Sequence, residues 1–327
     1  MPHTTAPFTQ PNQGTCTNHL LLCRRPVLLR KFAKMLSSDV KSRREAFLRL
    51  TEAAGVAPRM GFIGGGNMAS AIYQGFLRAG FLEPHAIGLS DPSLPAQATA
   101  QEHGLSLVES NAALVEAFGD GLIWLAVKPQ ALPRVLAETP ALSSCPLLVS
   151  ILAGTSIAAI QSNLKADGSS PSVIRVMPNT PALVGKGISV LARSSNATSE
   201  QAGLVRELMQ TAGEVEEVGE ELLDAVTGIS GSGPAFVYTI LEALSDGSVR
   251  NGIPRPLADK LALWTLLGSA EMVRGSGQHP ALLRNAVCSP GGTTIAGVAA
   301  LEEHGLRNSL IKAVEAAYRR AVELSKL

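Results

Sequence analysis

Short apolar runs alternate with segments of helical spacing between residues 60 and 192. The runs have the length of buried strands, and most of them lead through a polar turn into a segment whose apolar residues lie three and four positions apart. They occupy 60–63, 86–89, 105–108, 122–127, 147–152, 173–177 and 188–192. Strands that are apolar along their whole length and are joined by helices form parallel sheets buried on both faces. The pattern therefore predicts an α/β fold with a mostly parallel sheet.

From about residue 220 onward the pattern changes to helices alone. Five segments with apolar residues at helical spacing, separated by glycine or proline, cover 234–249, 256–274, 279–287, 293–303 and 306–325. Some of them, such as Leu261–Leu267, are too apolar for an exposed surface. They are buried either within one bundle or against a second copy of the chain. We expect a homodimer, with a higher assembly of dimers left open, and we divide the chain into a sheet domain at 60–219 and an all-α dimerisation domain at 220–327.

The first 59 residues do not share this pattern. No acidic residue occurs before Asp39, whereas lysines and arginines flank short apolar runs. This bias is typical of an organellar transit peptide, but we favour an upstream extension or a misassigned start because Met60 directly precedes the first strand. The arginines at 24 and 25 interrupt the apolar stretch and argue against a secretory signal. We expect a poorly ordered extension with one short amphipathic helix at 43–54, in a protein that is cytoplasmic, or organellar if the segment is a transit peptide.

The composition favours a small molecule as the partner. The 28 basic and 27 acidic residues leave a formal net charge of +1, and aromatic residues make up only 4% of the chain. Neither a basic field nor many stacking surfaces are present, so we expect no nucleic acid and no membrane as partner. The cysteines at 16, 23, 145 and 288 form no C-x-x-C pair. Together with the lack of clustered histidines, this predicts neither a metal site nor a disulfide framework.

A glycine turn follows the first strand. Residues 61–69 read Gly-Phe-Ile-Gly-Gly-Gly-Asn-Met-Ala, and a helix is predicted from Asn67 to about Ala79, closed by Gly80. This is the strand, turn and helix order of a dinucleotide fingerprint, in which a helix N-terminus faces the pyrophosphate. A glycine turn without function is the alternative. We expect a Rossmann-type domain that binds a dinucleotide through Gly64, Gly65, Gly66, Asn67, Met68 and Ala69.

Further cofactor residues are expected after the other strands, because ligands of such sheets bind beyond the carboxyl ends of the strands. Ser90 and Asp91 end the second strand, where the adenosine ribose is expected, and Asn111 begins a later helix. The other candidates are Ala126, Val127, Lys128, Pro129, Ala153 and Gly154. Lys128 has two interpretations, a solvated lysine or a ligand of a phosphate or ribose, and we favour the ligand.

Two segments of the helical part place small hydroxyl residues ahead of helices. They are 227–234, with Thr227, Ser230 and Ser232, and 288–294, with Ser289, Thr293 and Thr294. Backbone N–H groups and a helix dipole in such a loop can hold a carboxylate. Ordinary helix capping by serine and threonine explains the same residues. Either segment alone leaves the two interpretations equal.

Taken together, five blocks resemble the pyrroline-5-carboxylate reductase family, in that family's order. They lie at 61–69, 126–130, 175–181, 224–235 and 289–294, so that the resemblance covers about residues 60 to 327. The Ser-Pro-Gly-Gly-Thr-Thr block at 289–294 is the most specific of them. The resemblance implies a reductase that transfers a hydride from NADPH or NADH to the imine carbon of 1-pyrroline-5-carboxylate and produces L-proline.

The resemblance also implies roles for particular residues. Thr294 is the candidate catalytic residue, whose hydroxyl hydrogen-bonds the ring nitrogen, while Ser289, Gly292 and Thr293 surround the substrate carboxylate. Glu220 is a weaker substrate-binding candidate. Asn285 is not transferred, because family members often carry asparagine where this chain has Ala286.

The preferred cofactor and two rival functions remain open at this point. Asp91 argues for NADH, since an acidic group at the end of the second strand accepts ribose hydroxyls and repels a 2′-phosphate. The resemblance allows both cofactors and slightly favours NADPH. One rival is a hydroxyacid or ketoacid reductase, although the only lysine in the helices from 234 to 303, Lys260, has the pattern of a surface residue. The other is a noncatalytic nucleotide-binding protein.

Overall fold

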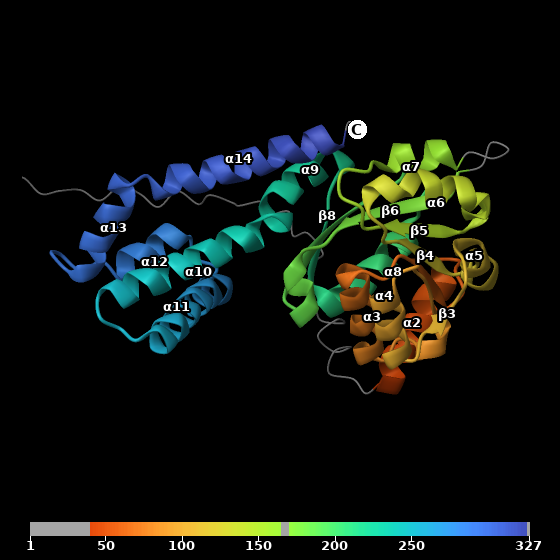
Figure 1. Ribbon diagram of the computed structural model, residues 1–327, viewed down its shortest axis with the longest axis horizontal. Helices are drawn as coiled ribbons and strands as arrows, with labels where there is room; N and C mark the ends of the chain where they lie inside the picture. Colours follow the sequence, from red (N-terminus) through yellow and green to blue (C-terminus); the bar gives the residue numbers. More distant parts are fainter. Residues whose placement is uncertain (1–39, 165–169, 326–327) are drawn as a thin grey trace, which may run out of the picture. The chain divides into compact units, whose positions relative to one another are not determined.

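One eight-stranded sheet organises residues 60 to 217 (Figure 1). The computed structural model describes residues 40–164 and 170–325. The strand order is β3-β2-β1-β4-β5-β6-β7-β8; the β6–β7 pair is antiparallel and the other neighbouring pairs are parallel. The bounds are β1 Met60–Ile63, β2 Ile87–Ser90, β3 Ser106–Leu107, β4 Leu122–Leu125, β5 Leu147–Ser150, β6 Ser172–Met177, β7 Gly187–Arg193 and β8 Gly213–Glu217. The predicted mostly parallel sheet is confirmed.

The edge strand β8 was not among the predicted strands. Only Val215 of its five residues is buried, while Glu214, Glu216 and Glu217 are exposed. An apolar run is the main signal of a buried strand, and this sequence has none. β8 pairs with β7 in parallel register because the helix before it, α8 Ser199–Met209, brings the chain back across the sheet.

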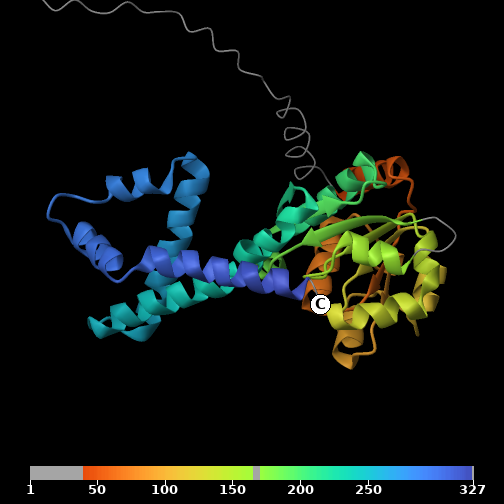
Figure 2. The ribbon, with the colours of Figure 1, turned by 90° about the horizontal axis from the view of Figure 1, so that it is seen from above.

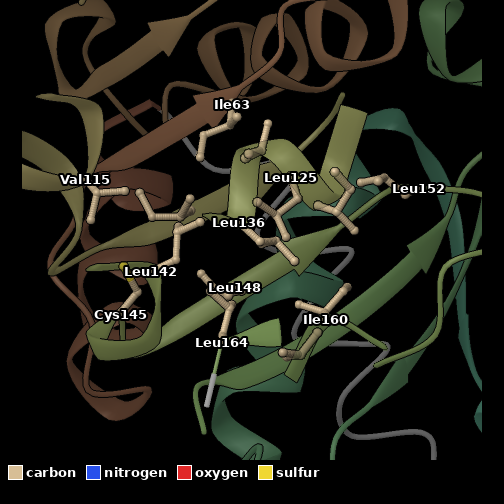
Figure 3. Close-up of a cluster of buried hydrophobic side chains, with 14 of the residues drawn as sticks. Ile63, Val115, Leu125, Leu136, Leu142, Cys145, Leu148, Leu152, Ile160 and Leu164 are labelled. Carbon is tan, nitrogen blue, oxygen red and sulfur yellow. The ribbon is translucent and has the colours of Figure 1, made fainter. Parts of the chain in front are cut away.

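Helices cover both faces of the sheet (Figure 1). They are α3 Asn67–Ala79, α4 Leu94–Glu102, α5 Asn111–Phe118, α6 Leu132–Glu138, α7 Ile157–Asn163 and α8. On one face a cluster of buried aliphatic side chains, among them Ile63, Leu125, Leu148 and Ile160, joins the sheet to α5, α6 and α7 (Figure 3). Burial of such side chains is the largest favourable contribution to the stability of the domain.

Aromatic side chains fill part of the other face. Phe62 of β1 and Trp124 of β4 stack with ring centroids 5.4 Å apart, and Phe76 of α3 lies 5.7 Å from Trp124. Successive residues of a strand point to opposite faces, so that Phe62 and its neighbour Ile63 supply the two cores. β1 is thereby fixed from both sides, and the turn that follows it has a rigid base.

Helix α2, Val40–Ala53, corrects the expectation for the N-terminal segment. Residues 40–53 are helical, close to the amphipathic helix predicted at 43–54, but they are not part of a poorly ordered extension. Phe47 is 1% exposed and stacks on Phe81 at 5.6 Å, and α2 packs against α8. The described fold therefore includes α2, and residues 1–39 lie outside the described part.

The five helices predicted after residue 220 are confirmed. Their bounds are α10 Gly233–Arg250, α11 Arg255–Ser276, α12 Pro280–Ala286, α13 Thr293–Glu303 and α14 Leu306–Leu324, preceded by α9 Leu223–Val226 and a π-helical turn at Thr227–Gly231. α14 returns alongside α9 and the π-helical turn, as the view from above shows (Figure 2).

Apolar side chains on α10 to α14 remain exposed in the single chain. Trp264 is 62% exposed, Tyr238 60% and Leu263 50%. A monomeric protein rarely exposes so many large apolar side chains close together. Burial within one compact bundle, the alternative considered for Leu261–Leu267, does not occur in the single chain.

Candidate cofactor and substrate site

The glycine turn after β1 has the geometry that a dinucleotide needs. Gly64 has φ +100°, and a Cβ atom there would lie 2.7 Å from the backbone of Ala126. A Cβ atom on Gly66 would meet no other atom within 4 Å, so the backbone is open on that side. Gly66 is the N-cap of α3 and no side chain caps the helix, which leaves the first N–H groups available to a pyrophosphate. These residues fit the predicted cofactor.

Hydrogen bonds bring the other predicted cofactor residues to the same edge of the sheet. The N–H of Gly64 donates to the carbonyl of Ser90 (2.9 Å), and the N–H of Ala126 donates to the carbonyl of Ile63 (2.9 Å). The Ser90 hydroxyl donates to Oδ1 of Asn111 (2.8 Å). The turns after β1, β2 and β4 and the start of α5 are therefore adjacent, as the sheet order predicts for the carboxyl ends of parallel strands.

A cavity of about 430 Å³ lies beyond the carboxyl ends of β4 and β5. Its lining includes Pro129, Ala153 and Gly154, which were predicted to bind the cofactor, and Leu324 and Ser325 at the end of α14. The neighbouring Lys128 is exposed, and within the described ranges no ion pair involves its ammonium group. The cavity therefore lies between the segments after β4 and β5 and the end of α14.

The loop at 289–294 leads into the first turn of α13. The N–H of Gly292 donates to the carbonyl of Ser289 (3.1 Å), and a Cβ atom on Gly292 would lie 2.2 Å from the Ser289 hydroxyl. No side chain caps α13, so the N–H groups at Thr293 and Thr294 remain available to a carboxylate. Ser289 and Thr293 are exposed and Thr294 is half-buried.

Within one chain the two halves of the predicted site stay separate. Across residues 40–164 and 170–325, no hydrogen bond or ion pair joins the 289–294 loop to the turns after β1, β2, β4 or β5. The Oδ1 atom of the neighbouring Asn285 accepts a hydrogen bond from the guanidinium of Arg284 (2.9 Å). Most of the loop is exposed in the single chain.

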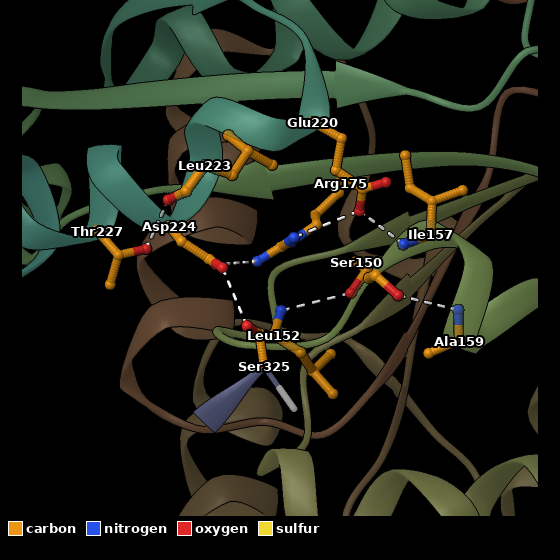
Figure 4. A network of polar contacts seen from close by, with 11 residues as sticks. Ser150, Leu152, Ile157, Ala159, Arg175, Glu220, Leu223, Asp224, Thr227 and Ser325 are labelled. Carbon is orange, nitrogen blue, oxygen red and sulfur yellow. Dashed lines mark hydrogen bonds and ion pairs between the residues drawn. The ribbon is translucent and has the colours of Figure 1, made fainter. Parts of the chain in front are cut away.

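Glu220 belongs to a partly buried polar network around Arg175 of β6 (Figure 4). Its Oε1 accepts from the N–H of Ile157 (2.7 Å) and from Nη1 of Arg175 (3.3 Å). Arg175, whose side chain is 5% exposed, also pairs with Asp224 at 3.4 Å, and the Ser325 hydroxyl donates to the same carboxylate (3.0 Å). The network ties α7, β6, α9 and the end of α14 together beside the cavity. Glu220 makes no contact with the 289–294 loop.

Arg175 and Asp224 were not among the predicted site residues. Arg175 interrupts the otherwise apolar run at 173–177, and an unpaired guanidinium is too costly to bury there. An arginine inside an apolar strand therefore indicates that acidic side chains lie nearby in the fold. Only the fold shows that they come from a segment about 45 residues later.

The opposite edge of the sheet has no predicted function. A hollow of about 780 Å³ there is lined by Gly55, Asp120, Thr139 and Cys145, among others. Burial raises the pKa of the Cys145 thiol to about 11, so it stays protonated and is a poor nucleophile near neutral pH. The described residues contain no group of histidine, cysteine and acidic side chains that could hold a metal ion.

Sequence comparison identifies the relatives of this chain. The family model for pyrroline-5-carboxylate reductase dimerisation matches residues 220–324, and the model for NADP oxidoreductase coenzyme F420-dependent proteins matches residues 59–154. Pyrroline-5-carboxylate reductase of Synechocystis sp. is 43% identical over 268 residues, covering 82% of this chain and 98% of the relative. The chain belongs to the pyrroline-5-carboxylate reductase family. Pyrroline-5-carboxylate reductase 2 of Bos taurus is also 43% identical, over 82% of this chain and 84% of that protein.

Solved structures of the family share the fold. The pyrroline carboxylate reductase of Plasmodium falciparum with NADP bound has a TM-score of 0.74 at 33% identity, covering 82% of this chain and 98% of that one. The pyrroline-5-carboxylate reductase of Coxiella burnetii has a TM-score of 0.75 at 33% identity, covering 82% and 99%. The predicted α/β class, with a Rossmann-type sheet domain followed by a helical dimerisation domain, is confirmed. No helix in the described part of the chain is long and apolar enough to span a membrane.

Proposed function

We propose that this chain reduces 1-pyrroline-5-carboxylate to L-proline with NADPH or NADH. The observation that carries the proposal is that one chain holds both a glycine turn open to a pyrophosphate and an uncapped hydroxyl-rich loop suited to a carboxylate. A noncatalytic nucleotide-binding protein has no need of the second feature. A hydroxyacid reductase needs a proton donor for an alkoxide, and Lys260, the only lysine in the helices from 234 to 303, is exposed.

The proposed chemistry requires alignment more than strong acid catalysis. Reduced nicotinamide supplies the hydride that the imine carbon accepts. A protonated imine is already electrophilic, so that hydride addition gives the secondary amine without further protonation. The N–H groups of Thr293 and Thr294 and the Ser289 hydroxyl hold the carboxylate, while Gly292, whose N–H donates to the Ser289 carbonyl, shapes the loop around it. The Thr294 hydroxyl hydrogen-bonds the ring nitrogen and orients the ring. Because a threonine hydroxyl is a weak acid, we assign it this orienting role rather than direct proton donation.

We infer that a second copy of the chain completes the site. The 289–294 loop and the cofactor turns do not meet within one chain, and the apolar faces of α10, α11 and α14 are exposed. A symmetric dimer buries these faces and brings a loop and a cofactor turn from different chains together. We therefore assign residues 220–327 to substrate binding and dimerisation and residues 60–219 to the cofactor. An assembly of several dimers is an extension of the same proposal.

We expect the enzyme to act in the cytoplasm, or in an organelle if the segment at 1–39 directs it there. The family models match only residues 59–154 and 220–324, so they give no role for residues 1–39. A fusion of residues 1–39 to a fluorescent protein distinguishes the two, since a transit peptide moves the fluorescence into an organelle.

The assay for the proposal measures proline. Purified protein is mixed with 1-pyrroline-5-carboxylate and either reduced cofactor, and cofactor oxidation is compared with proline formed. We expect one proline for each cofactor oxidised and no oxidation with 2-keto acids. Cofactor binding without proline formation would overturn the assigned activity.

A substitution at Thr294 tests the assigned role. Thr294→Ala removes the hydroxyl, and we expect kcat to fall by about 10- to 100-fold while the Kd for cofactor stays within about twofold. Thr294→Ser keeps a hydroxyl and should retain most of the turnover. An unchanged kcat in Thr294→Ala would discard the assignment.

A further inference from the structure

The carboxylate of Asp91 is fixed beside the glycine turn. The N–H of Gly65 donates to its Oδ2 (2.6 Å), and the N–H of Ser93 donates to its Oδ1 (2.7 Å). The side-chain amide of Gln97 also donates to the Asp91 carbonyl (2.8 Å), which holds the backbone on the α4 side. Each carboxylate oxygen keeps a lone pair for a further donor. Asp91 is thus a rigid acceptor at the end of β2.

A ribose and a 2′-phosphorylated ribose require opposite hydrogen-bonding groups at this position. The 2′- and 3′-hydroxyls of a ribose are donors and match a fixed carboxylate. A 2′-phosphate is an anion that needs N–H donors and positive charge. At Asp91 it would meet a negative charge, and the N–H groups of Gly65 and Ser93 already donate to that charge.

Within residues 40–164 and 170–325, no lysine or arginine forms an ion pair with the Asp91 carboxylate. The chain has no lysine or arginine between Arg78 and Lys128. Arg78 lies in the last turn of α3, far along that helix from the glycine turn, and Lys128 follows β4, which β1 separates from β2. The hydroxyl of Ser90 is occupied by Asn111. The exposed Ser93 hydroxyl alone cannot balance a phosphate.

We propose that Asp91 makes this enzyme select NADH over NADPH. The inference rests on the proposed function, because it concerns the nucleotide of that reaction. It differs from the slight preference for NADPH that the sequence resemblance implies, and it is a property of this chain rather than of the relative that holds NADP.

Binding of cofactor fragments tests the selection without turnover. Isothermal titration calorimetry with the full chain gives the Kd of ADP-ribose and of 2′-phospho-ADP-ribose. We expect wild type to bind ADP-ribose at least about tenfold more tightly, a difference of about 1.4 kcal/mol. Asp91→Asn removes the charge and keeps one acceptor, so this ratio should fall by about tenfold or more. Glu116→Gln removes an exposed carboxylate from the later part of α5 and should leave the ratio unchanged.

A second variant guards against local damage to the turn. Asp91→Ser removes both carboxylate oxygens and should shift the ratio in the same direction, with the melting temperature reported for each variant. Equal or tighter binding of the 2′-phosphorylated fragment by wild type, or an unchanged ratio in both Asp91 variants, would overturn the selection alone. Failure of wild type to bind either fragment would overturn the proposed function together with it.

Discussion

Arg175 shows how a single buried charge fixes the site. Its guanidinium is held by Glu220 and Asp224, and Glu220 in turn accepts from the first N–H of α7, beside the turn that carries Ala153 and Gly154. A buried ion pair is weak evidence of net stability, since desolvation offsets much of the attraction. Removing one partner, however, leaves the other charges without compensation. The network therefore constrains the position of the segments that line the cavity at Ala153 and Gly154.

Replacement of Arg175 has a matched control on the neighbouring strand. Arg175→Met should lower the free energy of unfolding by about 2–4 kcal/mol, because it leaves two partly buried carboxylates facing each other. Arg193→Met breaks a pair with Glu217 whose side chains are 39% and 34% exposed, and should cost less than about 1 kcal/mol. Urea unfolding followed by circular dichroism at a fixed protein concentration measures both values. Equal losses would mean that the Arg175 network contributes no more than a surface pair.

At the scale of elements, α2 is the unexpected part of the fold. It lies outside the regions that the family models match, which begin at residue 59, yet it packs on α8 and on the end of α3. The methyl group of Val40 would lie 2.4 Å from a Cβ atom on Gly80, and Arg44 pairs with Glu83. α2 thus covers the C-terminal end of α3, whose N-terminus follows the glycine turn. We expect it to stabilise the sheet domain without changing the chemistry.

Two substitutions on α2 test this contribution. Phe47→Ala deletes a side chain that is 1% exposed and should cost about 3 kcal/mol of unfolding free energy, while cofactor affinity in the folded protein stays unchanged. Leu48→Ala, on the same helix, changes a side chain that is 43% exposed and should cost less than about 0.5 kcal/mol. The two values come from the same urea titrations. A Phe47→Ala variant as stable as Leu48→Ala would show that α2 does not belong to the core.

For the whole molecule, the decisive question is whether the two halves of a site come from different chains. A Cβ atom at Gly66 would meet no other atom within 4 Å, so Gly66→Val should fill the open side of the glycine turn and abolish cofactor binding while the fold is kept. Thr294→Ala impairs the loop. The two variants are co-expressed with different tags, and the heterodimers are purified. One of the two sites in a heterodimer has both an intact turn and an intact loop only if each site takes its turn from one chain and its loop from the other.

The expected activity of that heterodimer is about half that of wild type, since one of the two sites of a symmetric dimer is restored. Each homodimeric variant should show a kcat reduced by about tenfold or more. If the heterodimer is no more active than the better homodimer, the site is built within one chain and the assignment to a second copy is wrong. Turnover per heterodimer, measured after tandem affinity purification, gives the result directly.

The sequence by itself determined most of the elements and the cofactor half of the site. Apolar runs and glycine signals are local, so β1, the glycine turn, α3 and the helices after residue 220 were predicted nearly as they occur. The carboxyl ends of parallel strands must share an edge, which placed Ser90, Asp91 and Ala126 correctly beside Gly64. The edge strand β8 was missed because exposed strands have no apolar run to mark them.

Only the tertiary structure decided what distant residues do to one another. It showed that Glu220 accepts hydrogen bonds from Arg175 and Ile157 and placed α2 in the core. Within the described part of one chain, no hydrogen bond or ion pair joins the 289–294 loop to the glycine turn. The structure also showed that the Asp91 carboxylate is held by two N–H groups. Such pairings join residues tens of positions apart, and a sequence pattern records which groups need partners but not which partners the fold supplies.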